Sequence, residues 1–121
     1  MQELIIRLGR PEWYSLNDRI HHYKRARIAK AVRGKAAMLA RAHLAPVTGP
    51  CTVTAHIAYP RNGRADPHNA AVVKHILDGL TDAGIWADDD STHIPAVAYR
   101  RDPATGTTGL WQVRLTITPT T

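Results

Sequence analysis

The chain has 121 residues and a formal net charge of +6, and 44% of its residues are hydrophobic. This length suffices for one domain with its own core and is short for two. The sequence has no run of eighteen apolar residues, and residues 1–8 lack the basic-then-apolar layout of a signal peptide. Cys51 is the only cysteine, which excludes an internal disulfide, so we expect a cytoplasmic protein that has no membrane partner.

The first third of the chain predicts a strand followed by a long basic helix. Residues 2–8 alternate in polarity, which is typical of a strand with one buried face. The sequence from Ser15 to Asp18 resembles a capping box that opens a helix, and Gly34 is a point at which that helix can bend or split. Apolar residues at a spacing of mostly three to four predict one buried stripe: Leu16, Ile20, Tyr23, Ile28, Ala31, Val32, Ala36 and Leu39.

The rest of the chain predicts a second helix among three strands. Asp66 is the predicted N-cap of this helix, which runs to about Ala83, and Gly84 suits a left-handed C-cap. The strands are predicted at residues 51–59, 94–101 and 110–118. This β-α-β-α-β-β order predicts one α+β domain over residues 1–121, with a mixed four-stranded sheet packed against the helices.

Charge is divided unevenly along the sequence. Residues 1–46 hold ten basic and three acidic residues, whereas residues 65–90 hold six aspartates and one lysine. A basic segment beside an acidic patch suits a nuclease, because cations attract phosphate and carboxylates hold a metal. The same pattern also fits two solvated faces of opposite sign, and charge alone does not separate these interpretations.

The acidic residues lie around the second predicted helix. Asp66 precedes it, and the run Asp88-Asp89-Asp90 follows it. A helix of about 17 residues is about 25 Å long, so its two ends cannot share a metal directly. The carboxylates can meet only if the acidic loop runs back along the helix, or if the next strand starts close to Asp66.

The region from Arg64 to His93 resembles the RusA family of crossover (Holliday) junction endodeoxyribonucleases. Members carry an Asp-x-Asp-Asn opening on a helix, a lysine within that helix, an Asp-Ala-Leu-like triplet, and then Ala-Gly followed by an apolar residue, in some cases Trp, any residue and Asp-Asp. The counterparts here are Asp66-Pro67-His68-Asn69, Lys74, Asp78-Gly79-Leu80 and Ala83-Gly84-Ile85-Trp86-Ala87-Asp88-Asp89. His68 replaces the second aspartate of the first motif, and two extra residues separate Asn69 from Lys74.

The resemblance implies a RusA-like fold and an Mg²⁺-dependent enzyme that makes paired nicks in branched DNA during recombination and repair. It assigns catalytic roles to Asp66, Asp89 and Lys74, with Lys74 stabilising charge on the phosphate. The implied metal ligands are Asp66, Asp89 and Asp88, with Asp90 or His68 completing the set. Mn²⁺ is a possible substitute, because imidazole suits Mn²⁺ better than Mg²⁺.

The same interpretation assigns the basic residues to DNA. The predicted phosphate contacts are Arg19, Lys24, Arg25, Arg27, Lys30, Arg33, Arg61 and Arg64. Such contacts position a duplex without reading its sequence, which suits an enzyme that selects branched shape. The resemblance also implies a homodimer, since two symmetric cuts in a four-way junction need two active sites.

Each assignment has a simpler alternative. Asp66 can be only a helix cap, Asp88 to Asp90 a solvated loop, and Lys74 a surface lysine, while His68 can lie near the metal without binding it. We interpret Trp86 and Trp111 as core residues, with base-stacking platforms as the alternative. The alternative function is a non-catalytic protein that binds branched or duplex DNA through a degenerate metal site.

Overall fold

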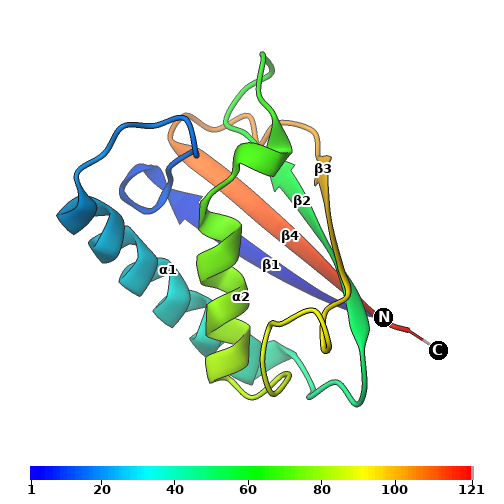
Figure 1. The fold of residues 1–121 in the computed structure, drawn as a ribbon. Coiled ribbons are helices and arrows are strands. Elements are labelled where there is room, and N and C mark those ends of the chain that lie inside the picture. Colours follow the sequence, from blue (N-terminus) through cyan, green and yellow to red (C-terminus); the bar gives the residue numbers. More distant parts are fainter. Residues whose placement is uncertain (121) are drawn as a thin grey trace.

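The computed structural model describes residues 1–120 and has two helices and one sheet, as predicted (Figure 1). The helices and strands in chain order are β1 (Gln2–Gly9), the 3₁₀ turn η1 (Arg10–Glu12), α1 (His22–His43), β2 (Cys51–Ala58), the 3₁₀ turn η2 (Pro67–Asn69), α2 (Val72–Asp82), β3 (Ala96–Arg101) and β4 (Leu110–Pro119). The predicted α+β class and mixed four-stranded sheet are confirmed. No helix within residues 1–120 has the length and apolarity needed to cross a membrane.

The sheet has the strand order β1-β4-β2-β3, and only its last pair is parallel. β4 runs antiparallel to both β1 and β2, with Leu115 opposite Leu4 on one side and Ala55 on the other. β2 and β3 run parallel, and α2 supplies the crossover that a parallel pair requires. The end of β2 and the start of β3 therefore lie at opposite ends of the sheet.

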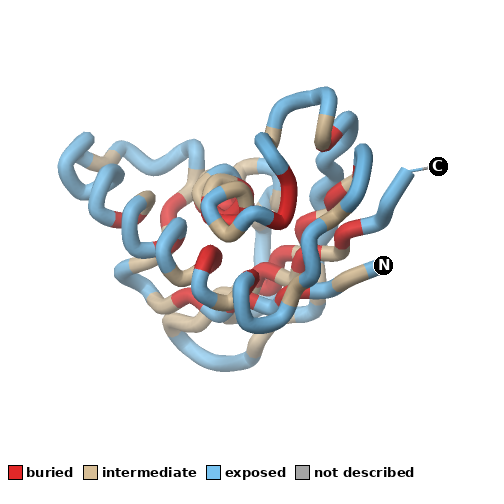
Figure 2. The backbone as a smooth tube through the Cα atoms, turned by 90° about the horizontal axis from the view of Figure 1, so that it is seen from below, coloured by how far each residue is buried: buried red, intermediate tan, exposed pale blue. Residues whose placement is uncertain are grey.

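The core lies between one face of the sheet and the two helices (Figures 1 and 2). The buried residues alternate along β1, β2 and β4, as the period-two pattern predicts, whereas the edge strand β3 is exposed throughout. They include Leu4, Ile6, Leu8, Val53, Ala55, Ile57, Val113, Leu115 and Ile117. Cys51 begins β2 on this same face and is fully buried, which raises the pKa of its thiol.

Gly79 sets the distance between α1 and α2. A Cβ atom at this position would lie 2.5 Å from the carbonyl oxygen of Arg33 and 2.8 Å from the Cβ of Ala36. The missing side chain thus lets the two backbones approach closely, and the predicted inward residues Ile76 and Leu80 pack into the core beside it. α1 is continuous through Gly34, where the sequence allowed a break.

The predicted start of the first helix is wrong. The helix begins at His22, not Ser15, and the Leu16 and Tyr23 side chains are 66% and 71% exposed. Ser15 instead forms an isolated antiparallel bridge with Ala70, and the Leu16 amide donates to the Asn69 carbonyl at 2.9 Å. This pairing keeps the chain extended there, so the Ser15–Asp18 hydrogen bond closes a turn rather than capping a helix. Ala31, also predicted as inward, is exposed.

The second helix also starts later than predicted. Asp66 caps only the 3₁₀ turn η2, and its carboxylate accepts no capping hydrogen bond. α2 then begins at Val72, because the backbone of Ala70, which is paired with Ser15, is not helical. The predicted left-handed cap at the other end is confirmed: Gly84 has φ +77°, and the Ile85 amide donates to the Leu80 carbonyl at 3.1 Å.

Candidate functional site

The acidic loop after α2 folds back along that helix. Its course is fixed by buried anchors at Ile85, Trp86 and Ile94, and the Trp86 indole donates to the Thr81 hydroxyl at 2.8 Å. Between these anchors the loop places Asp89 beside Asp78 in the middle of α2, within reach of the Lys74 ammonium.

Lys74, Asp78 and Asp89 form one cluster on the exposed side of α2, which we call the acidic cluster. The Lys74 ammonium donates to Asp78 at 2.9 Å and to Asp89 at 2.5 Å. The hydrogen bond from Lys74 holds the pKa of the Asp89 carboxyl below its usual range, and the same two carboxylates raise the pKa of Lys74. The Asp89 side chain is only 13% exposed, whereas that of Lys74 is 64% exposed.

The two neighbours of Asp89 have different surroundings. The Asp88 carboxylate accepts a hydrogen bond from the backbone amide of Asp89 at 2.8 Å, so it lies beside the acidic cluster. Asp90 faces its own loop, where it accepts the amides of Thr92 and His93 and contacts the His93 ring at 2.6 Å. These contacts lower the pKa of Asp90 and give it a turn-forming role in the conformation described.

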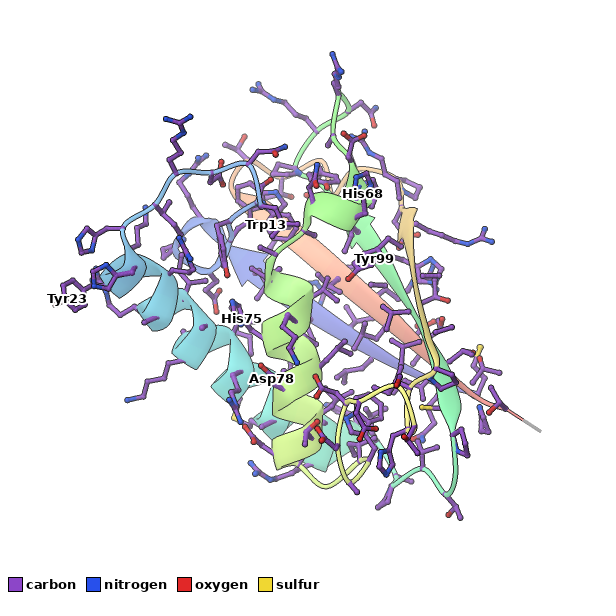
Figure 3. All side chains as sticks on the ribbon, viewed as in Figure 1. Trp13, Tyr23, His68, His75, Asp78 and Tyr99 are labelled. Carbon is purple, nitrogen blue, oxygen red and sulfur yellow. The ribbon has the colours of Figure 1, made fainter. Side chains whose placement is uncertain are left out.

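Asp66 and His68 lie apart from the acidic cluster, around η2. Asp66 lines a hollow of about 530 Å³ beside Trp13 and Tyr59, and His68 is exposed on η2 (Figure 3). Six residues of α2 separate Val72 from Asp78, a rise of about 9 Å, and η2 adds to this separation. Within residues 1–120, no three His, Cys, Asp or Glu side chains are grouped so that they could hold a metal.

The predicted DNA-binding residues of α1 and the segment before it are exposed, and most have no acidic partner. No ion pair between described residues includes Arg19, Lys24, Arg25, Arg27 or Lys30. Arg33 differs, because it donates to both oxygens of Asp82 at 2.6 and 2.8 Å. This paired geometry raises the pKa of Arg33 and neutralises its charge locally.

A second concave site lies where β2, β3 and β4 meet the loops at the end of the sheet. This hollow of about 850 Å³, which we call the arginine hollow, shares Tyr59, Arg64 and Ala65 with the hollow that contains Asp66. Its charged and aromatic lining residues are Arg10, Arg61, Arg64, Arg101, Tyr59 and Trp111. Trp86 is buried, as predicted, but Trp111 is only partly buried and lines this hollow.

Sequence reasoning missed much of this second site. Arg61 and Arg64 were predicted from the basic loop, but Arg10, Arg101 and the two rings come from distant parts of the sequence. Only the strand register unites them, with Leu8 opposite Trp111 and Ile57 opposite Arg101.

Comparisons with known proteins identify no relative. No protein-family model matches the chain, and no curated protein matches it with significant similarity. The resemblance to RusA therefore depends on the residues quoted for it and remains a prediction.

Proposed function

We propose that this chain is a divalent-metal-dependent endodeoxyribonuclease that makes paired nicks in four-way DNA junctions during recombination and repair. The observation that carries the proposal is the return of the acidic loop along α2, which brings Asp89 to Lys74. These residues match the second carboxylate and the helix lysine of the RusA pattern, and they are distant in sequence. Their contact places a possible metal ligand beside a cation that could stabilise charge on a phosphate, the two groups that metal-dependent phosphodiester hydrolysis uses.

The donor set suits a hard divalent cation. Asp78 and Asp89 already direct carboxylate oxygens at one positive group, the Lys74 ammonium, and Asp88 lies next to them. Mg²⁺ or Mn²⁺ would be held by Asp89 with Asp88, whereas Asp66 and His68 lie apart from these oxygens and Asp90 is bonded within its own loop. Such an ion polarises the scissile phosphate and lowers the pKa of the attacking water.

Lys74 has a second role in this proposal. With a divalent cation held at Asp89, the Lys74 ammonium would be free to contact the phosphate. Its high exposure, 64%, leaves room for that contact. Lys74 would then stabilise negative charge that develops on the phosphate or on the leaving oxygen.

In the proposed enzyme, the unpaired cations would bind the phosphates of DNA. Exposed residues such as Arg27 and Lys30 are free to neutralise phosphates along a duplex arm, whereas Arg33 is held by Asp82. A homodimer would present two such surfaces and two active sites related by a two-fold axis, which matches the symmetry of paired cuts.

The second candidate function is a non-catalytic protein that binds branched or duplex DNA. It is favoured by the separate positions of Asp66 and Asp89, and by the aspartate that His68 replaces. Both proposals use the same basic residues, so binding experiments alone do not distinguish them.

A cleavage assay separates the two proposals. The protein is incubated with a synthetic four-way junction, a linear duplex of one arm and a single strand, each with EDTA, Mg²⁺ or Mn²⁺. We expect symmetric nicks in the junction only when a metal is present, and faster cutting with Mn²⁺ if His68 is a ligand. A junction that is retarded in a gel but stays intact under every condition would support the binding protein, and degradation of all substrates would indicate a less selective nuclease.

A further inference from the structure

The arginine hollow has an unusual concentration of positive charge. Four of its fourteen lining residues are arginines, Arg10, Arg61, Arg64 and Arg101, and none is acidic. Its volume of about 850 Å³ is within the range of about 300–1,000 Å³ that is common for small-molecule sites. The hollow is therefore large enough for a nucleotide-sized anion and carries no carboxylate that would repel one.

The charges in this hollow are not neutralised by the protein. No hydrogen bond or ion pair between described residues includes the side chains of Arg10, Arg61 or Arg64. Arg101 donates to the carbonyl oxygen of Gly63 at 2.5 Å, which orients its guanidinium and leaves its charge in place. Arginines whose charge is left free in a concave site favour an anionic ligand.

Aromatic rings form the floor beneath these guanidinium groups. The Arg101 guanidinium lies 4.9 Å from the ring centre of Tyr59, and that of Arg10 lies 5.8 Å from the ring of Trp111. Trp13 supports both rings, because it stacks on Trp111 at 5.5 Å and meets Tyr59 edge-on at 5.8 Å. Rings and guanidinium planes are the surfaces on which unpaired nucleic-acid bases stack.

The walls of the hollow are fixed by hydrogen bonds before any ligand arrives. The loop after β3 is joined to the end of β2, since the Thr105 amide donates to the Tyr59 carbonyl at 2.8 Å and the Gly106 amide donates to the Pro60 carbonyl at 3.0 Å. A preformed site of this kind loses little conformational entropy on binding.

We propose that the arginine hollow binds a nucleotide of single-stranded DNA, with its phosphate against the arginines and its base stacked on the guanidinium and ring surfaces. A paired base hides its faces within the duplex, so a concave stacking site selects unpaired nucleotides. The inference rests on the proposed function in taking DNA as the ligand, and it adds how the branch point is held. The hollow is continuous with the one that contains Asp66, so an unpaired nucleotide there lies next to one predicted metal ligand.

The test measures binding of a dye-labelled twelve-nucleotide oligo(dT) by fluorescence anisotropy in EDTA, with a twelve-base-pair duplex and inorganic phosphate as competitors. The Arg10→Ala/Arg101→Ala variant removes two charges at the hollow, and Arg7→Ala/Arg41→Ala removes two exposed charges outside the predicted DNA-binding set as the matched control. We expect the first variant to lose about tenfold or more in affinity for oligo(dT), as for the loss of one stacked base. The control variant should lose much less. Equal losses in the two variants would overturn the proposal, since bulk charge alone would explain them.

Two further readouts distinguish stacking from simple anion binding. Trp111 lines the arginine hollow with Trp13 stacked on it, while Trp86 is buried at the C-terminal end of α2, so oligo(dT) should quench tryptophan fluorescence and phosphate should not. Arg101→Lys keeps the charge but loses the planar group, so it should restore only part of the affinity. An oligo(dT) complex without quenching, or full rescue by Arg101→Lys, would overturn the stacking assignment.

The failures of this inference and of the proposed function are distinguishable. Binding of oligo(dT) needs neither metal nor Asp89, so it stands even if no junction is ever cut. Conversely, the protein could cut junctions normally while the hollow variant binds oligo(dT) as well as the native protein does. That result would reject the nucleotide site in the arginine hollow and leave the proposed endonuclease function standing. Thermal unfolding of each variant checks that it is folded, and Arg101→Lys provides a second variant if the double substitution unfolds.

Discussion

The acidic cluster and the arginine hollow use charged side chains in opposite ways. In the acidic cluster, Lys74 is bonded to two carboxylates, and nearby Arg33 is bonded to Asp82. In the arginine hollow, the guanidinium groups of Arg10 and Arg101 meet rings and a backbone carbonyl, and no acid. The first region has its cations paired and one carboxylate in excess, and the second carries uncompensated positive charge.

This difference separates two tasks that one surface could not perform well. A region whose cations are already paired attracts phosphate weakly, but its carboxylates are positioned to receive a divalent cation. A region with free arginines attracts phosphate strongly, but it offers no metal ligands of its own. The comparison predicts that substitutions in the acidic cluster change catalysis, and that substitutions among the free cations change affinity.

The largest effect is expected for the predicted catalytic carboxylates. Asp66→Asn or Asp89→Asn should reduce junction cleavage on the order of 100-fold or more, because each removes a metal-binding charge worth several kcal/mol in the transition state. Junction affinity should be unchanged or higher, since repulsion of phosphate falls. Cleavage rates and gel-shift affinities measure the two effects.

Asp82→Asn is the matched control, since it removes the same charge from the end of α2, the helix that lies between Asp66 and Asp89 in the sequence. Cleavage should be retained in this variant. Loss of both cleavage and affinity in the Asp66 and Asp89 variants would instead indicate a structural role for these carboxylates.

The next largest effect concerns the spacing of the helices beside the acidic cluster. Gly79→Ala should destabilise the fold by about 1–3 kcal/mol, because the new methyl group would overlap the Arg33 carbonyl oxygen at 2.5 Å. Gly34→Ala is the matched control: it adds the same methyl group where nothing lies within 4 Å. It should stabilise α1 by about 0.5–1 kcal/mol. Chemical denaturation gives both values, and the same sign for the two variants would contradict the described helix contact.

A smaller effect is expected for the salt dependence of DNA binding. Arg27→Ala removes a free cation and should reduce the slope of log affinity against log salt by about 1. Arg33→Ala removes a cation already bonded to Asp82, so it should change the slope less. Titrations of a labelled duplex at several salt concentrations measure the slopes, and a larger change for Arg33 would mean that DNA displaces Asp82.

The smallest effect is a pH dependence of stability at His75. Its ring nitrogen shares a hydrogen bond with the Tyr14 hydroxyl at 2.7 Å. Burial lowers the pKa of His75, Asp78 acts to raise it, and Lys74 and Arg33 act to lower it further. The folded state therefore favours neutral His75. Its contribution to the free energy of unfolding is fully present above the unfolded pKa of about 6.5, and it is lost as the pH falls from there through the lower pKa of the folded state.

A comparison with His75→Gln isolates this contribution. Between pH 7 and pH 5 the melting temperature of the native protein should fall further than that of the variant. The pKa of His56 is also lowered by burial, but this residue is present in both proteins and cancels. Parallel melting curves over this pH range would assign the whole pH dependence to other groups.

Local patterns predicted the elements whose neighbours are close in sequence. The alternation in residues 2–8 and the glycine at position 84 gave a strand and a C-cap where the structure has them. The start of α1 could not be predicted, because it depends on the bridge between Ser15 and Ala70, which are distant in sequence. In the same way, the RusA motif indicated Lys74 and Asp89 but could not predict that Asp78 shares their hydrogen bonds.

The arginine hollow lay largely beyond sequence reasoning. Its residues follow no motif, and Trp111 fits the alternation of β4 equally well as a core residue. The exposure of Trp111 to the hollow can be seen only when the register of β4 with β1 and β2 is known. Long-range pairing, rather than composition, thus decides which arginines are free.

The buried thiol of Cys51 offers a practical route to several of these questions. With no accessible surface and a raised pKa, it should stay unreactive toward maleimides while the protein is folded. A cysteine introduced at exposed Tyr23 would therefore be the sole site of labelling. One probe per chain would then report the separation of two protomers, or the bend of a bound junction, with no background from the native sequence.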